Sequence, residues 1–181
     1  PAYWGDLGAC AGDPGGGDPP PDPQSIQIFG LWHAGKDFAE WATTREWTEF
    51  NYANGWIIDR GDGSGDPSVN LVVLSFVNPL DLLNPSSTRN PLGGIPIGMT
   101  QEVVDYFKKA GIRVMLSIGG VTYTDDWNAA LVEDAWQLGL NAAAVASELG
   151  VGIEIDYEEN TDPDLVGLQA FVDAYRFVHP Y

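Results

Sequence analysis

Cysteine, histidine and basic side chains are scarce in this sequence. Its 181 residues include one cysteine, two histidines and eight lysines and arginines together. A single cysteine, Cys10, excludes a disulfide within the chain. His33 and His179 are too few and too isolated for a metal centre or for a serine–histidine pair. We therefore expect neither a metal ion nor a cofactor.

The shortage of basic residues leaves the chain strongly acidic. Asp and Glu number 26, so the formal net charge is −18 at pH 7. Such a surface repels phosphate backbones and anionic lipid. No apolar run approaches the roughly 18 residues that span a bilayer, and the chain begins at Pro1 without the charged and apolar regions of a signal peptide. We expect a mature or trimmed soluble product that binds neither nucleic acid nor membranes.

The chain divides into a tail with a linker and one folded domain. Residues 11–23 are almost entirely Gly, Pro, Ala and Asp, a composition that cannot bury a core. The residues that follow are richer in apolar and aromatic side chains, and their number favours a single core. We therefore expect a tail and linker over residues 1–23 and one domain over residues 24–181.

Within this domain, four short apolar runs alternate with longer amphipathic stretches. The runs have the length and the β-branched or aromatic content of strands and cover residues 25–32, 71–77, 113–118 and 151–157. Helical patterns cover residues 38–52, 101–110, 128–149 and 164–177, and we expect Gly111 and Gly150 to end two of them. This alternation predicts an α/β fold with a parallel sheet and right-handed crossovers.

The fourth run places three carboxyl groups on one side of a strand. Because side chains alternate across a strand, Glu154, Asp156 and Glu158 share one face, while Tyr157 and its apolar neighbours face the helices. Like charges this close do not all ionise readily in a low-dielectric interior, so we expect at least one carboxyl to keep a proton near neutral pH. A protonated carboxyl is what cleavage of a glycosidic bond needs. The alternative is a strand end whose acids are solvated.

Two motifs resemble those of family 18 glycoside hydrolases. Ser117-Ile118-Gly119-Gly120 matches the SxGG motif of that family's third strand, and residues 151–158 are similar to its fourth-strand signature DGxDxDxE. The resemblance extends over nearly all of residues 24–181. It implies a (β/α)8 TIM-barrel type of fold, of which this chain carries about the first four β/α units.

The resemblance implies a role for each carboxyl group. Glu158 takes the place of the general acid and base, and Asp156 that of the residue that holds the 2-acetamido group of the substrate. The acetamido oxygen attacks the anomeric carbon in this substrate-assisted, retaining mechanism. Glu154 stands where the family has its inner Asp, which keeps a carboxyl group in the proton relay with Asp156. The expected substrate is chitin or another β-1,4-linked N-acetylglucosamine oligosaccharide, and the expected location is extracellular.

Five further residues are candidates for substrate binding. In the family pattern, Ser117, Gly119 and Gly120 support the floor of the site, and the glycines let the chain turn where a side chain would block the sugar. Trp32 and Tyr123 are candidates for stacking on sugar faces. Ordinary packing in the core or at the rim is the other interpretation of these two rings.

Two departures from the family pattern keep a second function open. Val151 stands where the family has its first Asp, and Glu154 lengthens the inner carboxyl by one methylene group. The barrel is also half complete, so we expect either a missing C-terminal half or two copies that associate. The two hypotheses are a chitinase-like hydrolase and a noncatalytic sugar-binding, structural or assembly protein built on a half barrel.

Overall fold

The structure is a computed structural model that describes residues 28–34, 47–84 and 101–180. The expected tail and linker, including Cys10, lie outside the described residues, as does most of the helix expected over residues 38–52.

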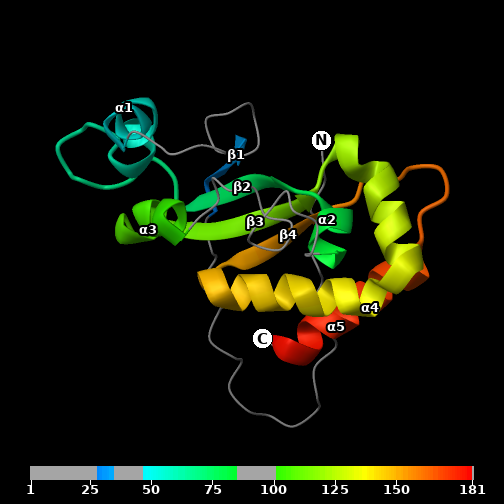
Figure 1. Ribbon diagram of the computed structural model, residues 1–181. Helices are drawn as coiled ribbons and strands as arrows, with labels where there is room; N and C mark the ends of the chain where they lie inside the picture. Colours follow the sequence, from blue (N-terminus) through cyan, green and yellow to red (C-terminus); the bar gives the residue numbers. More distant parts are fainter. Residues whose placement is uncertain (1–27, 35–46, 85–100, 181) are drawn as a thin grey trace, which may run out of the picture.

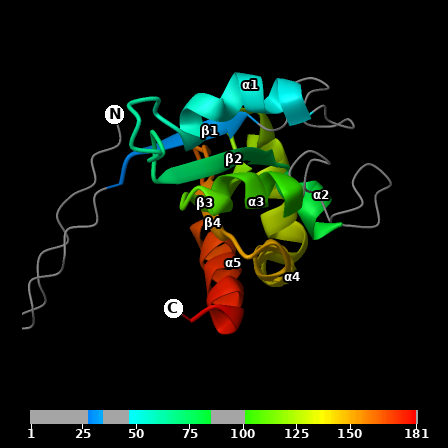
Figure 2. The same ribbon diagram turned by 90° about the vertical axis from the view of Figure 1, so that its left-hand side faces the viewer.

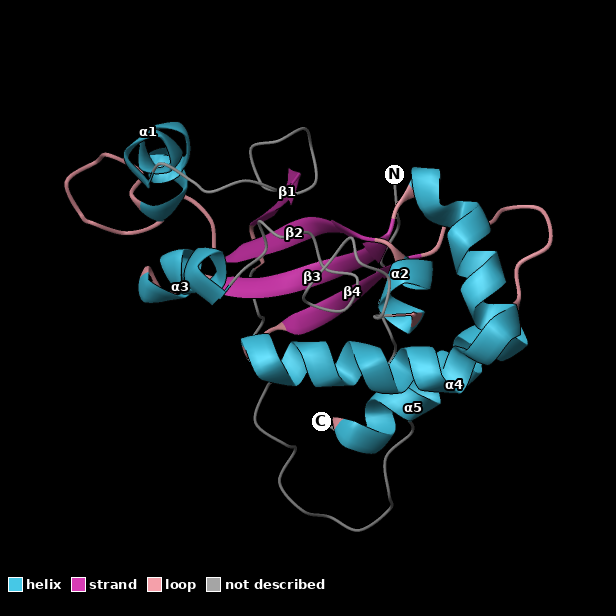
Figure 3. Ribbon diagram, viewed as in Figure 1, coloured by secondary structure: helices cyan, strands magenta, loops and turns pink. Residues whose placement is uncertain are grey.

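Four parallel strands form one sheet, in the order β1 (Gly30–Ala34), β2 (Leu71–Val77), β3 (Arg113–Gly119) and β4 (Gly152–Asp156). Figure 3 shows them side by side. Each strand is next to its neighbour in sequence, so a right-handed crossover can join each pair. The predicted alternation of strands and helices in a parallel α/β fold is confirmed.

The main helices are α1 (Trp47–Ile58), α3 (Gln101–Lys109), α4 (Thr124–Leu149) and α5 (Leu165–Val178), with a short α2 (Pro79–Leu83) after β2. In Figure 2, α2, α3 and α4 lie on one side of the sheet. Gly111 (φ 78°) and Gly150 (φ 64°) adopt the left-handed conformation that ends α3 and α4. Both predicted helix ends are confirmed.

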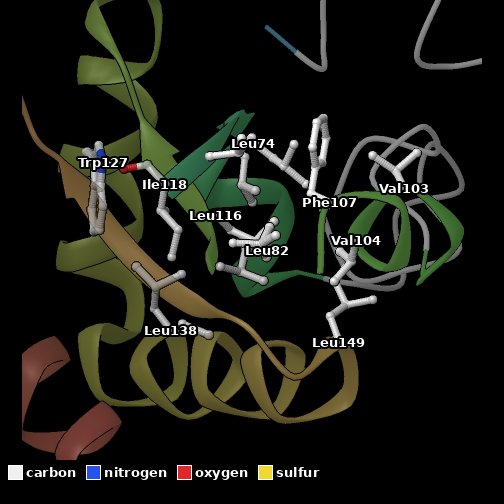
Figure 4. Close-up of a cluster of buried hydrophobic side chains, with 14 of the residues drawn as sticks. Leu74, Leu82, Val103, Val104, Phe107, Leu116, Ile118, Trp127, Leu138 and Leu149 are labelled. Carbon is white, nitrogen blue, oxygen red and sulfur yellow. Dashed lines mark hydrogen bonds between the residues drawn. The ribbon is translucent and has the colours of Figure 1, made fainter. Parts of the chain in front are cut away.

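The core lies between the sheet and these helices. Leu74 of β2 and Leu116 of β3 are fully buried, and Phe107 of α3 and Trp127 of α4 cover them with rings that are 0% exposed. Figure 4 shows these side chains in one cluster. Burial of large apolar side chains such as these stabilises the packing of the helices on the sheet. Each fully buried side chain contributes roughly 1.5–3 kcal/mol to the free energy of folding.

Some element boundaries differ from the sequence expectation. α2 was not predicted, because its five residues are defined by a cap and not by a hydrophobic period: the Asn78 side chain accepts hydrogen bonds from the backbone N–H groups of Leu80 and Asp81. α4 begins four residues earlier than expected and bends at Asp134, whose backbone is not helical and whose carboxylate accepts from the Gln137 N–H. The bend is visible in Figure 1.

The sheet is open over the part of the chain that the structure describes. There, β1 and β4 each pair with one neighbouring strand only. The parallel α/β class is therefore established, whereas closure into a (β/α)8 barrel stays a prediction.

Candidate active site

The predicted carboxyl groups lie at the carboxyl end of β4. Figure 1 shows this end of the sheet beside the start of α4 and the loop that joins β4 to α5. Glu154 and Asp156 are inside β4 on one face, and Glu158 follows two residues after the strand. Glu158 lies close enough to Asp156 to raise its pKa, through its negative charge and through a side-chain hydrogen bond. The structure thus brings two of the predicted site residues close together at the edge where parallel α/β proteins place their ligands.

The environment of Asp156 favours its protonated form. Burial raises the pKa of Asp156 to about 6, and the negative charges of Glu154 and Glu158, together with the hydrogen bond to Glu158, act in the same direction. Asp156 therefore holds a proton in slightly acidic solution.

Ser117 and Glu154 bring two unsatisfied polar atoms to the floor of the site. The two residues are register partners on β3 and β4. Ser117 is 0% exposed, and within the described part of the chain neither its Oγ nor the buried Oε2 of Glu154 has a hydrogen-bond partner. Buried polar groups are nearly always paired in folded proteins. These two unpaired atoms lie on neighbouring strands, on the same face as Asp156.

Gly119 and Gly120 fix the end of β4 against the end of β3. The N–H of Gly120 donates to the backbone carbonyl of Asp156 over 2.9 Å. Gly119 has φ 118°, and a Cβ there would overlap the Asp156 carbonyl and the indole nitrogen of Trp127. Gly120 has φ 95°, and a Cβ would lie 3.0 Å from the Phe76 ring. Only glycine fits where the chain after β3 lies this close to β4, and this close contact fixes the position of Asp156.

A hydrogen-bond network on the helix side holds the loop after β4. The hydroxyl of Tyr157 donates to Asn128 Oδ1 of α4 (2.6 Å) and accepts from the Asp164 N–H (3.0 Å). Its ring lies 5.7 Å from that of Trp127. The prediction that Tyr157 faces the helices is confirmed. Sequence analysis did not identify Asn128, because a polar residue in an amphipathic helix gives no signal of a contact with a distant loop.

Glu158 and Glu159 are adjacent in sequence but lie in different surroundings. The Glu159 carboxylate accepts hydrogen bonds from the Thr161 N–H (2.7 Å) and from Asn128 Nδ2 (3.2 Å). These bonds, with the one from Thr161 the strongest, lower the pKa of Glu159. Glu159 is thus an ionised loop-forming residue, while Glu158 contacts Asp156.

The two predicted aromatic residues differ in their distance from the carboxyl pair and in their exposure. Trp32 of β1 is 63% exposed. It belongs to a row of residues in register across the sheet, with Val73 of β2, Met115 of β3 and Gly152 of β4. This row of residues is four positions before Asp156, or roughly 13 Å along the strand. Tyr123, in the short 3-10 helix η1 (Val121–Tyr123), is 6% exposed, so its ring offers little free surface. Their roles in sugar binding stay predictions.

Within the described ranges, no three histidine, cysteine or carboxylate side chains converge in a way that could hold a metal ion. No helix in those ranges is both long enough and apolar enough to cross a membrane.

Comparisons with protein-family models, with curated proteins and with solved structures found no match for this chain. The functional interpretation therefore depends on the residues of the site and on the motifs that contain them.

Proposed function

We propose that this chain forms the catalytic side of a chitinase-like family 18 glycoside hydrolase that cleaves β-1,4-linked N-acetylglucosamine polymers. The observation that carries the proposal is the raised pKa of Asp156, which lies beside Glu158 at the carboxyl end of a parallel strand. General acid catalysis needs a protonated carboxyl group in the site, and burial together with like charges raises the pKa of Asp156 to about 6, so that it can supply a proton beside Glu158. The SxGG and DGxDxDxE-like motifs supply the substrate class.

In the proposed first step, Glu158 donates its proton to the glycosidic oxygen while the bond from this oxygen to the anomeric carbon breaks. The 2-acetamido oxygen of the substrate forms a bond to the anomeric carbon, and Asp156 accepts the hydrogen bond from the acetamido N–H. In the second step, ionised Glu158 removes a proton from water. The water oxygen forms a bond to the anomeric carbon, and the bond from this carbon to the acetamido oxygen breaks. The configuration is retained and Glu158 regains its proton.

The remaining predicted residues support this geometry. Glu154 adds negative charge beside Asp156 and therefore helps to keep a proton on Asp156. Ser117 Oγ and Glu154 Oε2 offer unpaired polar atoms for a substrate group or a water molecule. On the same face, the exposed Trp32 provides a ring on which a sugar of an extended polymer can stack.

The proposed fold of the complete catalytic unit is a (β/α)8 barrel, with this chain supplying the first four β/α units. The unpaired outer edges of β1 and β4 in the described sheet support it, because open edges are sites for further strands. The other half would come from a C-terminal continuation or from a second copy. The proposed location is extracellular, where chitin is found.

The test is hydrolysis of chito-oligosaccharides with a fluorescent aglycone by the wild-type chain, by Glu158→Gln and by Glu159→Gln. The two variants remove neighbouring carboxylates, but Glu159 accepts hydrogen bonds from Thr161 and Asn128 and is not among the groups that raise the pKa of Asp156. We expect Glu158→Gln to lose at least about 100-fold in kcat, as the removal of a general acid does. Glu159→Gln should keep most of the activity. Equal losses in both variants would contradict the proposed role of Glu158.

A noncatalytic sugar-binding or assembly protein is the second candidate function. Val151 favours it, since this residue packs against the core where the family pattern has a carboxylate. Its N–H donates to the Ala146 carbonyl, a helix-capping role that any residue except proline can fill. Binding of chito-oligosaccharides by a folded wild-type chain that releases no aglycone would favour this second function.

A further inference from the structure

A cavity lies at the end of the sheet opposite to the carboxyl pair. Its volume is about 530 Å³, and its lining includes Leu71, Arg113 and Gly152, the first residues of β2, β3 and β4. The cavity is therefore at the amino ends of the strands, whereas Asp156 and Glu158 are at the carboxyl ends. Its size is within the range of small-ligand sites, about 300–1,000 Å³.

The wall of the cavity is mainly apolar. Ile28, Leu71 and Met115 contribute aliphatic and thioether side chains. Gly152 has no side chain and so leaves room in the cavity. A Cβ there would lie 3.3 Å from Met115 Cγ and would fill part of the cavity. An apolar wall of this kind favours a ligand with an aliphatic or aromatic body.

Two cations lie on the same lining. Lys108, in the last turn of α3, donates a hydrogen bond to the carbonyl of Gly150 (2.8 Å), which holds its ammonium group at the rim. Arg113 is exposed at the start of β3. In the described part of the chain, Arg60 forms ion pairs with Asp62 and Asp66, whereas neither Lys108 nor Arg113 forms one.

These charges are unusual in their setting. The chain has only eight basic residues and a net charge of −18, so its surface in general repels anions. Two cations without an ion-pair partner at one apolar cavity therefore favour the binding of an anion there. The guanidinium of Arg113 can donate two parallel hydrogen bonds to one carboxylate, which an ammonium group cannot do.

We infer that this cavity binds a small amphipathic carboxylate, with the apolar body against Leu71 and Met115 and the carboxylate on Arg113 and Lys108. The site is on the same face of the sheet as the proposed active site but at the opposite ends of the strands. Neutral molecules with the same apolar body lack the ionic contact and bind less tightly.

The test is titration of the uniformly 15N-labelled full chain with octanoate, followed by two-dimensional 1H–15N NMR. Gly111, Gly150 and Gly152 line the cavity and provide amide signals in a distinct region of the spectrum. We expect saturable shifts of these signals. Arg113→Ala should weaken octanoate binding roughly tenfold, since a charge-assisted hydrogen bond is lost. Octan-1-ol should bind the wild-type chain more weakly than octanoate by a similar factor.

Arg176→Ala is the matched control, because Arg176 is an exposed arginine on α5 that does not line the cavity. It should bind octanoate as the wild-type chain does. Gly152→Leu fills the cavity and should abolish the shifts at Gly111 and Gly150. No saturable shift at the three glycines, equal binding by Arg113→Ala and Arg176→Ala, or equal affinity for octanol and octanoate would each overturn the inference.

Discussion

The side chain of Asp156 destabilises the folded state when it is ionised, but it can also carry a proton for the chemistry of the site. Burial and two neighbouring carboxylates raise its pKa to about 6, so the ionised form destabilises the folded state at neutral pH. Proteins accept such local destabilisation at sites where a proton is needed. We therefore expect Asp156 to lower the stability of the folded chain at neutral pH while supplying a proton to the site.

We expect the stability of the folded chain to depend on pH through Asp156. Its pKa is about 6 in the folded state and near 3.8 in the unfolded state, so the folded state binds more protons between these values. The contribution of Asp156 to the free energy of unfolding is therefore fully present below about pH 4 and is lost as the pH rises through about 6. Asp156→Asn removes this titration, so the variant should gain stability relative to the wild type between pH 4 and pH 7.

Urea unfolding at several pH values measures this difference. Asp173→Asn, on the exposed face of α5 and hydrogen-bonded only to Gln169 in the described part of the chain, is the control and should parallel the wild type. A stability difference between Asp156→Asn and the wild type that does not change with pH would show that Asp156 does not titrate in this range.

At the residue scale, the sequence predicts part of the site. Alternation along β4 places three carboxyl groups on one face, and like-charge repulsion predicts a raised pKa for at least one, as Asp156 has. The sequence does not show that Asp156 is the one, because burial depends on the depth of each side chain. Nor does it separate Glu158 from Glu159, since the bonds that hold Glu159 come from Asn128 and from the loop backbone.

At the scale of elements, close packing of α4 on α5 depends on a small residue. A Cβ at Gly139 would overlap the backbone carbonyl of Phe171 and would lie 2.7 Å from the Cβ of Ala174. Glycine in a helix normally destabilises it relative to alanine by about 1 kcal/mol. Here the close approach of two helices reverses that preference.

Two glycine-to-alanine variants test this reversal. Gly139→Ala should lower the free energy of unfolding by about 1–3 kcal/mol, because the added methyl forces the helices apart. Gly55→Ala in α1 should raise it by up to about 1 kcal/mol, because the nearest atom to its Cβ, Asn51 Oδ1, is at an ordinary contact distance of 3.8 Å. Thermal or urea unfolding measures both. Stabilisation by Gly139→Ala would contradict the packing of α4 on α5.

The elements that the sequence predicts best are those with strong periodic patterns. β2 has the predicted bounds, and α3 ends one residue before the predicted end because Gly111 stops it. α2 and the start of α4 were missed because local hydrogen bonds define them: the Asn78 cap for α2, and the turn of η1 that leads directly into α4. A period in hydrophobicity carries no information about such caps.

At the scale of the whole molecule, charge is the dominant feature. The net charge is −18, and in the part that the structure describes the ion pairs are confined to Arg60 with Asp62 and Asp66. Most carboxylates thus repel one another without a compensating cation. Repulsion of this kind favours the expanded, unfolded chain.

We therefore expect added salt to stabilise the fold. Raising NaCl from about 20 mM to about 150 mM shortens the screening length to about 8 Å, so repulsion between carboxylates farther apart than this is largely screened and the melting temperature at pH 7 should rise. Because general screening depends on ionic strength and not on the ion, NaCl and KCl should act alike. At about pH 4, where many carboxylates are protonated, the same increase in salt should have a much smaller effect. A salt effect of equal size at both pH values would assign the stabilisation to strengthened apolar burial, which does not depend on the charge of the chain.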